Sequence, residues 1–263
     1  MATKKRIILH DTLYHITTRL VNKELWFNVY KVAKRKGKKK GIRMNNIHPM
    51  SLNRLRKVPR REIVILIEKV MKHLNKKYGF KIYHFLIMDD HYHMIAKTTN
   101  PKYKLDSCMR VFNMMIAKGI NRLTKRTGHV FGSRYKSNAI LDEDYAKIVL
   151  GYIYANPVKA KMVKKPEHHD YTSYKNYVLK KYDHLPIETD CPILEGESKD
   201  KERYGEILKE LVEGYIYERV GIRHETFVSK LKCQVLVKKE SFERLNEDLK
   251  TLILKVEKNF CEG

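Results

Sequence analysis

Cysteine is scarce in this sequence, and long hydrophobic runs are missing from it. The four cysteines stand at positions 108, 191, 233 and 261. No two have the close spacing of a zinc knuckle or a redox motif, so we expect free thiols in a reducing compartment. No apolar run approaches the roughly 20 residues that span a bilayer. The start, MATKKRIILH, is basic, but its apolar run is too short for a signal peptide. These absences predict a cytoplasmic protein with no membrane partner.

Acidic residues are in a clear minority. The chain has 55 Lys and Arg against 30 Asp and Glu, a formal net charge of +25. Such an excess predicts attraction to a polyanion, and nucleic acid is the first candidate. An anionic membrane surface comes second, because no strongly amphipathic basic helix flanked by Trp or Phe is evident. A soluble domain that merely tolerates its charge is the third alternative.

The 263 residues, 43% of them hydrophobic, can bury a substantial core. Periodicity and turn residues predict strands at 12–21, 80–88 and 92–98, an extended segment at 129–141, and helices within 60–79, 100–128 and 142–163. Glycine should end the first two helices, and Pro157 should end the third near Asn156. This order predicts an α+β fold, a sandwich with a mainly antiparallel sheet.

Two regions outside this pattern have their own character. Residues 29–46 are basic and punctuated by glycine, and we interpret them as a loop that helps phosphate binding without specifying it. Pro186, Pro192 and the polar run 195–200 mark a shift in composition. Beyond it, residues 201–221 and 239–260 are predicted to be helical. We therefore expect a main domain at 1–178 and a helical extension of unknown role at 179–263.

The stretch MDDHYHMIAK, residues 88–97, carries the most informative pattern. Asp89 and Asp90 should form a tight turn between two strands. Side chains two apart in a strand share a face, so His91 and His93 should project together while Tyr92 points into the core. Two imidazoles can bind one metal ion if a third group completes the site. The plainer alternative is a pair of partly buried histidines satisfied by hydrogen bonds.

FLIMDDHYHMIAKT (85–98) resembles the His-hydrophobic-His signature of single-tyrosine transposases of the insertion-sequence 200 type and of their relatives associated with repetitive extragenic palindromes. Four further segments resemble this family in the same order: YHITTRLVNKELWF (14–27), INRLTKRTGHVFGSRYKS (120–137), YIYANPVKAKMV (152–163) and YTSYKNY (171–177). The resemblance covers about residues 12–178. It implies a ferredoxin-like fold with the histidines on a central strand.

The resemblance also implies a reaction. Such proteins cleave single-stranded DNA at hairpin-flanked sites, and a tyrosine becomes linked to the 5′-phosphate while a 3′-OH is released. Tyr135 is the expected nucleophile, with Arg134 and Lys136 as phosphate partners. His91 and His93 would bind Mg²⁺ or Mn²⁺, with Asn138 as the candidate third ligand. A surface tyrosine beside two charges is the alternative for Tyr135.

Where the family often has Asn before the first histidine, this chain has Asp90, which could tighten metal binding or cap the turn. Ala139 argues against a two-tyrosine mechanism. A homodimer and a monomer both stay open. The sequence therefore predicts a metal-dependent transposase that cleaves and rejoins single-stranded DNA. The alternatives are a domesticated, non-catalytic nucleic-acid-binding protein on the same fold and a rolling-circle initiator, whose helicase segment or second tyrosine is not seen.

Overall fold

The computed structural model describes residues 8–21, 60–125, 127–180, 185–193 and 200–217. Its strands are β1 (Leu13–Arg19), β2 (Phe80–Ile87), β3 (His91–Thr98) and β4 (Lys136–Ile140). Its helices are α3 (Arg60–Tyr78), α4 (Leu105–Thr124), α5 (Glu143–Lys159), the short 3₁₀ helix η2 (Pro166–His168), α6 (Tyr174–Val178) and α7 (Lys201–Tyr217).

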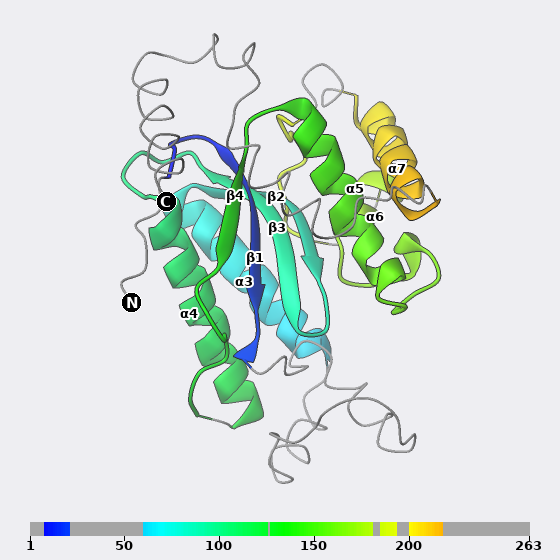
Figure 1. Ribbon diagram of the computed structural model, residues 1–263. Helices are drawn as coiled ribbons and strands as arrows, with labels where there is room; N and C mark the ends of the chain where they lie inside the picture. The colour runs from blue at the N-terminus through cyan, green and yellow to red at the C-terminus, as the bar shows by residue number, and fades with distance from the viewer. Residues whose placement is uncertain (1–7, 22–59, 126, 181–184, 194–199, 218–263) are drawn as a thin grey trace, which may run out of the picture.

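The four strands form one antiparallel sheet in the order β2-β3-β1-β4 (Figure 1). The chain passes from β1 through α3 to the β2–β3 hairpin, and then through α4 to β4. This succession and strand order are those of a ferredoxin-like sandwich, so the α+β prediction is confirmed. β1 and β3 occupy the centre of the sheet, and β4 is an edge strand.

The hairpin between β2 and β3 has the predicted tight turn. Asp89 and Asp90 are its two central residues, and the amide of Met88 donates to the carbonyl of His91 at 2.8 Å. Gly79 ends α3 with φ of +61°, a conformation that side chains with a Cβ rarely adopt. A short connection therefore fixes where β3 begins, at His91.

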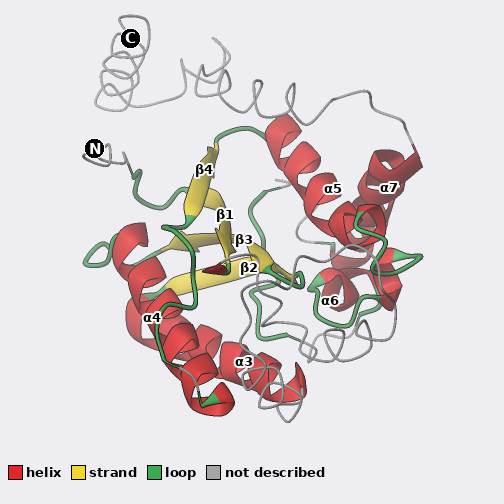
Figure 2. Cartoon of the chain, turned by 60° about the horizontal axis from the view of Figure 1, so that its bottom comes forward, coloured by secondary structure: helices red, strands yellow, loops and turns green. Residues whose placement is uncertain are grey.

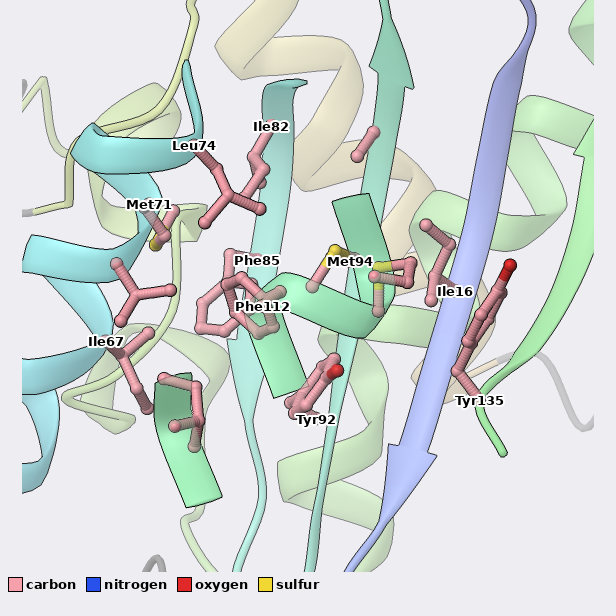
Figure 3. Close-up of a cluster of buried hydrophobic side chains, with 14 of the residues drawn as sticks. Ile16, Ile67, Met71, Leu74, Ile82, Phe85, Tyr92, Met94, Phe112 and Tyr135 are labelled. Atoms are coloured by element: carbon pink, nitrogen blue, oxygen red, sulfur yellow. The ribbon is translucent and has the colours of Figure 1, made fainter. Parts of the chain in front are cut away.

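Helices α3 and α4 cover one face of the sheet (Figure 2). Their apolar sides pack on Ile16, Phe85, Tyr92 and Met94, which alternate with residues of the opposite face (Figure 3). Tyr92 is 1% exposed and donates its hydroxyl to Asn113 Oδ1 at 2.6 Å. The prediction that Tyr92 points into the core is confirmed.

Helices α5, α6 and α7 lie on the other side of the sheet (Figure 2). A second apolar cluster joins Leu86 and Ile95 of the sheet to Val149 and Ile153 of α5 and Leu208 of α7. Asp142 caps the start of α5, and its carboxylate accepts from the amide of Tyr145 at 2.7 Å. The same helix therefore packs both on the sheet and on α7.

A buried polar network ties α7 to the sheet. His84 of β2 is fully buried, and its Nδ1 and Nε2 lie 2.6 Å from the Tyr154 hydroxyl and 2.8 Å from the Tyr204 hydroxyl. Tyr154 in turn bonds Ser173 Oγ at 2.7 Å. Burial lowers the pKa of His84 to about 3. Part of the predicted extension thus shares the core of residues 80–178.

Two predicted helix ends were wrong. Helix α5 does not end near Asn156, because Pro157 lies inside it and the turn after it is closed by the Ala160 amide, which donates to the Asn156 carbonyl at 2.8 Å. Packing of α5 on two neighbours outweighs the lost proline hydrogen bond. Helix α4 ends at Thr124, and the capping residue Lys125 adopts the left-handed conformation that we expected of glycine.

Of the segment 129–141, which was predicted to be extended, Lys136–Ile140 form strand β4. Before it, Phe131 forms an isolated bridge with Leu20, and the Gly132 amide donates to the Arg19 carbonyl at 3.1 Å.

The predicted basic loop at 29–46 and the predicted helix at 239–260 lie outside the described residues. Within the part of the chain that the structure describes, no helix is both long and apolar enough to cross a membrane.

Candidate functional site

The register of the sheet divides the predicted site residues between its two faces. His91 pairs with Arg19, and His93 pairs with Thr17. These four side chains therefore project from the face that α5 covers, together with Ile95 of the second apolar cluster. Tyr92 projects from the α3–α4 face. The predicted projection of His91 and His93 from one face is confirmed.

His91 and His93 lie side by side at the start of β3. Their ring centroids are 4.9 Å apart. The Nδ1 of His91 bonds Asp90 Oδ1 at 2.5 Å, and the Nδ1 of His93 lies 3.1 Å from His15 Nε2. Within the described residues, no hydrogen bond reaches His91 Nε2, and the buried His93 Nε2 has no partner. Each imidazole is thus held by one nitrogen and has the other uncommitted.

His15 belongs to this arrangement, although no motif or spacing in the sequence predicted it. It is 6% exposed, and its ring stacks on that of His93 at an interplanar angle of 16°. Burial lowers the pKa of His15 to about 4. Burial, followed by the charges of His15, His91 and Arg19, holds the pKa of His93 well below its usual value. Both rings are therefore neutral at physiological pH, and neutral imidazole is the form that binds metal ions.

Asp90 connects the turn to the site. Its second carboxylate oxygen lies 3.6 Å from Arg19 Nε, and its carbonyl accepts from the Leu20 amide at 2.7 Å. Burial raises the pKa of Asp90, but the hydrogen bond from His91 and the charges of His91 and Arg19 outweigh it, so the pKa is lowered. Metal-binding histidines usually have such a carboxylate, which bonds the ring nitrogen that does not bind the metal and so orients the ring.

Tyr152 of α5 is the tyrosine that lies with these histidines. Its ring centroid is 5.5 Å from that of His93 and 6.1 Å from that of His15, in edge-on arrangements. Asn156 follows one helical turn later on the same helix face and donates its amide to the Tyr152 carbonyl at 3.0 Å. A tyrosine and an asparagine four residues apart in YIYANP are the sequence pattern that could have indicated this site. With 17 tyrosines in the chain, this one was not singled out.

Tyr135 is not brought to the histidine pair. It is 5% exposed and belongs to the apolar cluster of the α3–α4 face, where Figure 3 draws it near Ile16. Its hydroxyl donates to Asp106 Oδ1 at the start of α4, and Arg134 lies 3.5 Å from the same oxygen. The sheet therefore separates Tyr135 and Arg134 from His91 and His93.

Lys136 and Asn138 do lie on the histidine face. Lys136 pairs with Thr17, so His93, Thr17 and Lys136 form one row across three strands. Asn138 pairs with His15, and its side chain lies near the Tyr145 hydroxyl without a hydrogen bond to it. Asn138 is thus one strand removed from the pair that it was predicted to join. The exposed Lys136 and Arg19 give this end of the face a positive charge.

The donor set fits a divalent ion in part. The imidazoles of His91 and His93 each have an uncommitted Nε2 atom, and that of His93 is buried without a partner among the described residues, so both are suitable ligands. No group of three or more His, Cys, Asp or Glu suited to a metal occurs among the described residues. A third protein ligand would have to be a side-chain amide or hydroxyl, and Asn156 is placed on the same helix face as Tyr152.

Comparison with known proteins gives two findings. The family model for "Transposase IS200 like" matches residues 46–156. The fold is similar to a solved structure of a REP-associated tyrosine transposase bound to a REP hairpin, with a TM-score of 0.46 and 16% identity, over 75% of this chain and 96% of that chain. No match was found among curated proteins. The stretch that matches the IS200-like transposase model, residues 46–156, contains both histidines and Tyr152.

Proposed function

We propose that this chain cleaves and rejoins single-stranded DNA at hairpin-flanked sites, with Tyr152 as the nucleophile and His91 and His93 as ligands of a divalent metal ion. The observation that carries the proposal is the position of Tyr152 against His93, on the sheet face where both histidines project. The match of residues 46–156 to the IS200-like transposase model supports a reaction on DNA, and the net charge of +25 supports a polyanionic partner.

The protein's own groups have distinct roles in this reaction. Arg19 and Lys136 would hold the phosphate backbone on the histidine face by charge-assisted hydrogen bonds. The Tyr152 oxygen would attack the phosphorus and lose its proton. The bond from phosphorus to the 3′ oxygen would break, and that oxygen would take up a proton as a free 3′-OH. The 5′-phosphate stays on Tyr152, and a second 3′-OH can reverse the attack without an external energy source.

A bound Mg²⁺ or Mn²⁺ would offset the charge on the non-bridging phosphate oxygens. His91 and His93 would hold it through their Nε2 atoms, and Asn156 is our candidate for the third ligand. Asn138 is a weaker candidate, because its side chain faces Tyr145. Asp90 and His15 would keep the two rings oriented through their Nδ1 atoms.

The chemistry is tested by incubating the full chain with single-stranded hairpin DNA from the flanks of its own gene, with Mg²⁺ or Mn²⁺. We expect a protein–DNA adduct that resists denaturation and is abolished by chelator. His91→Ala and His93→Ala should each remove most of the adduct. The matched control is His129→Ala, which changes an exposed histidine that is not a proposed metal ligand and should leave adduct formation unchanged.

A non-catalytic nucleic-acid-binding protein is the alternative. It would bind the same DNA tightly and form no adduct with either metal or either flank. Loss of adduct in His129→Ala to the same extent as in His91→Ala would also count against the proposed site.

A further inference from the structure

The segment that carries Arg134 and Tyr135 is not used by the chemistry proposed above. It runs back along α4, from the Gly128 carbonyl, which accepts from Asn121 Nδ2 at 2.9 Å, to Asp106 in the first helical turn. Between this segment and α4 lies a pocket of about 460 Å³. Asp106, Arg110 and Asn113 line it at helical spacing, with Ser107 beside them and Arg134 and Tyr135 opposite.

The polar groups of this pocket are mostly hydrogen-bond donors. The Asp106 carboxylate is already approached by the Tyr135 hydroxyl and by Arg134. Asn113 Oδ1 accepts from the buried Tyr92 hydroxyl, which leaves the Asn113 NH₂ group as the part that can serve a ligand. Within the described residues, no hydrogen bond or ion pair engages the Arg110 guanidinium or the Ser107 hydroxyl. The pocket therefore suits a ligand that is anionic and rich in acceptors.

We propose that this pocket binds one nucleotide of a single DNA strand. Arg110 and Arg134 would take the phosphate, because guanidinium groups bind phosphate oxygens through paired N–H donors. The Asn113 amide and Ser107 would bond acceptor atoms on the base edge. The volume falls in the range of roughly 300–1,000 Å³ that holds small ligands, whereas a phosphate ion alone would fill little of it.

The position of the pocket gives the bound nucleotide a path to the histidine site. β4 is an edge strand, Lys136 lies on its histidine face, and Arg134 lies on the α4 side two residues earlier. A strand held by Lys136 can therefore pass around the β4 edge and reach Arg134. This path rests on the proposed function, but nucleotide binding in the pocket requires no cleavage.

The test measures binding separately from chemistry. The full chain carrying Tyr152→Phe is titrated, with chelator present, into a fluorescently labelled single-stranded oligonucleotide from the gene's flank. Arg110→Gln should raise Kd by about tenfold, as expected for a lost charge-assisted contact. Arg122→Gln, which removes the same charge from the exposed far end of α4, should raise Kd by no more than about twofold.

A second variant and a cross-linking experiment test the pocket independently of Arg110→Gln, so that poor folding of one variant does not decide the result. Asn113→Asp keeps an acceptor for the Tyr92 hydroxyl but replaces the donor with a charge that repels phosphate, so Kd should rise by more than tenfold. An oligonucleotide with a photoreactive base should cross-link to peptides from 104–115 or 127–136. Equal Kd values for Arg110→Gln and Arg122→Gln, cross-links confined to other peptides, or full competition by millimolar inorganic phosphate would overturn the proposal.

Loss of pocket binding with intact adduct formation would reject only the pocket. Pocket binding without any adduct would support the pocket and reject the proposed chemistry. The two proposals can therefore fail separately.

Discussion

The Nε2 atom of His15 lies 3.1 Å from the Nδ1 atom of His93, and the two buried rings stack with their centroids 5.3 Å apart. One of the two nitrogens must donate and the other accept, so this bond couples the tautomers of the two rings. It holds the His93 ring in place and leaves Nε2 as the nitrogen that is not engaged by the protein.

His15→Phe should therefore weaken metal binding. Phenylalanine keeps a planar ring at this position but cannot bond His93 Nδ1, and loss of the group that orients a metal-binding histidine typically costs about 10- to 100-fold in metal affinity. Mn²⁺ titration followed by calorimetry or electron paramagnetic resonance measures this without DNA. His15→Gln, which retains a hydrogen-bonding group, should lie between Phe and wild type. Unchanged Mn²⁺ affinity in His15→Phe would show that His15 only packs.

Asp90 should act on His91 in the same way. Asp90→Ala removes the acceptor from His91 Nδ1 and the partner of Arg19, and should weaken Mn²⁺ binding by about tenfold. Asp90→Asn keeps the hydrogen bond and loses only the charge, so it should bind within about threefold of wild type. Equal Mn²⁺ affinities for Asp90→Ala and wild type would show that Asp90 only shapes the turn.

Helix α7 should stabilise the sheet domain through its contact with His84. Tyr204→Phe leaves the buried His84 Nε2 without its partner, which should lower the free energy of unfolding by about 1–3 kcal/mol. Tyr103→Phe removes a hydroxyl with no hydrogen bond in the described residues and should change it by less than about 0.5 kcal/mol. Urea unfolding of the full chain measures both. Equal stabilities for the two variants would mean that α7 contributes nothing through this bond.

The buried His84 also predicts a pH dependence of stability. Its pKa is about 3 in the fold because burial disfavours the charged ring, whereas an unfolded histidine titrates near 6.5. The unfolded state therefore binds more protons at acid pH. The contribution of His84 to stability is complete above pH 6.5 and is lost as pH falls from there towards 3.

His84→Gln keeps a hydrogen-bonding side chain between Tyr154 and Tyr204 but does not titrate. Between pH 6 and 4, the free energy of unfolding of wild type should fall more steeply than that of His84→Gln, by about 1.4 kcal/mol per pH unit. Parallel pH curves for the two proteins would contradict a neutral His84 in the fold.

The sequence predicted those parts of the fold that depend on local pattern. The alternation of FKIYHFLI and HYHMIAKT, separated by two aspartates, predicted a hairpin with both histidines on one face. Helix ends were less predictable. Pro157 removes one hydrogen bond from α5, which local pattern shows, but packing of α5 on the sheet and α7 stabilises the helix, which local pattern does not show.

The position of the site's tyrosine could not be predicted from spacing within a strand. Tyr135 directly precedes Lys136, the first residue of β4. Lys136 projects from the histidine face, whereas Tyr135 projects from the α3–α4 face. Tyr152 is 59 residues from His93 along the sequence, and only the packing of α5 on β3 places it there. Contacts between elements of this kind leave no local pattern.

The central claim is that Tyr152, not Tyr135, becomes linked to DNA. The direct measurement is adduct formation by wild type, Tyr152→Phe and Tyr135→Phe on the same hairpin DNA with Mn²⁺, with the linked peptide identified by mass spectrometry. We predict no adduct for Tyr152→Phe, an adduct for Tyr135→Phe, and a DNA-linked peptide that contains YIYANPVK. An adduct that persists in Tyr152→Phe and disappears in Tyr135→Phe would contradict the account and would require the segment carrying Tyr135 to cross to the other face of the sheet.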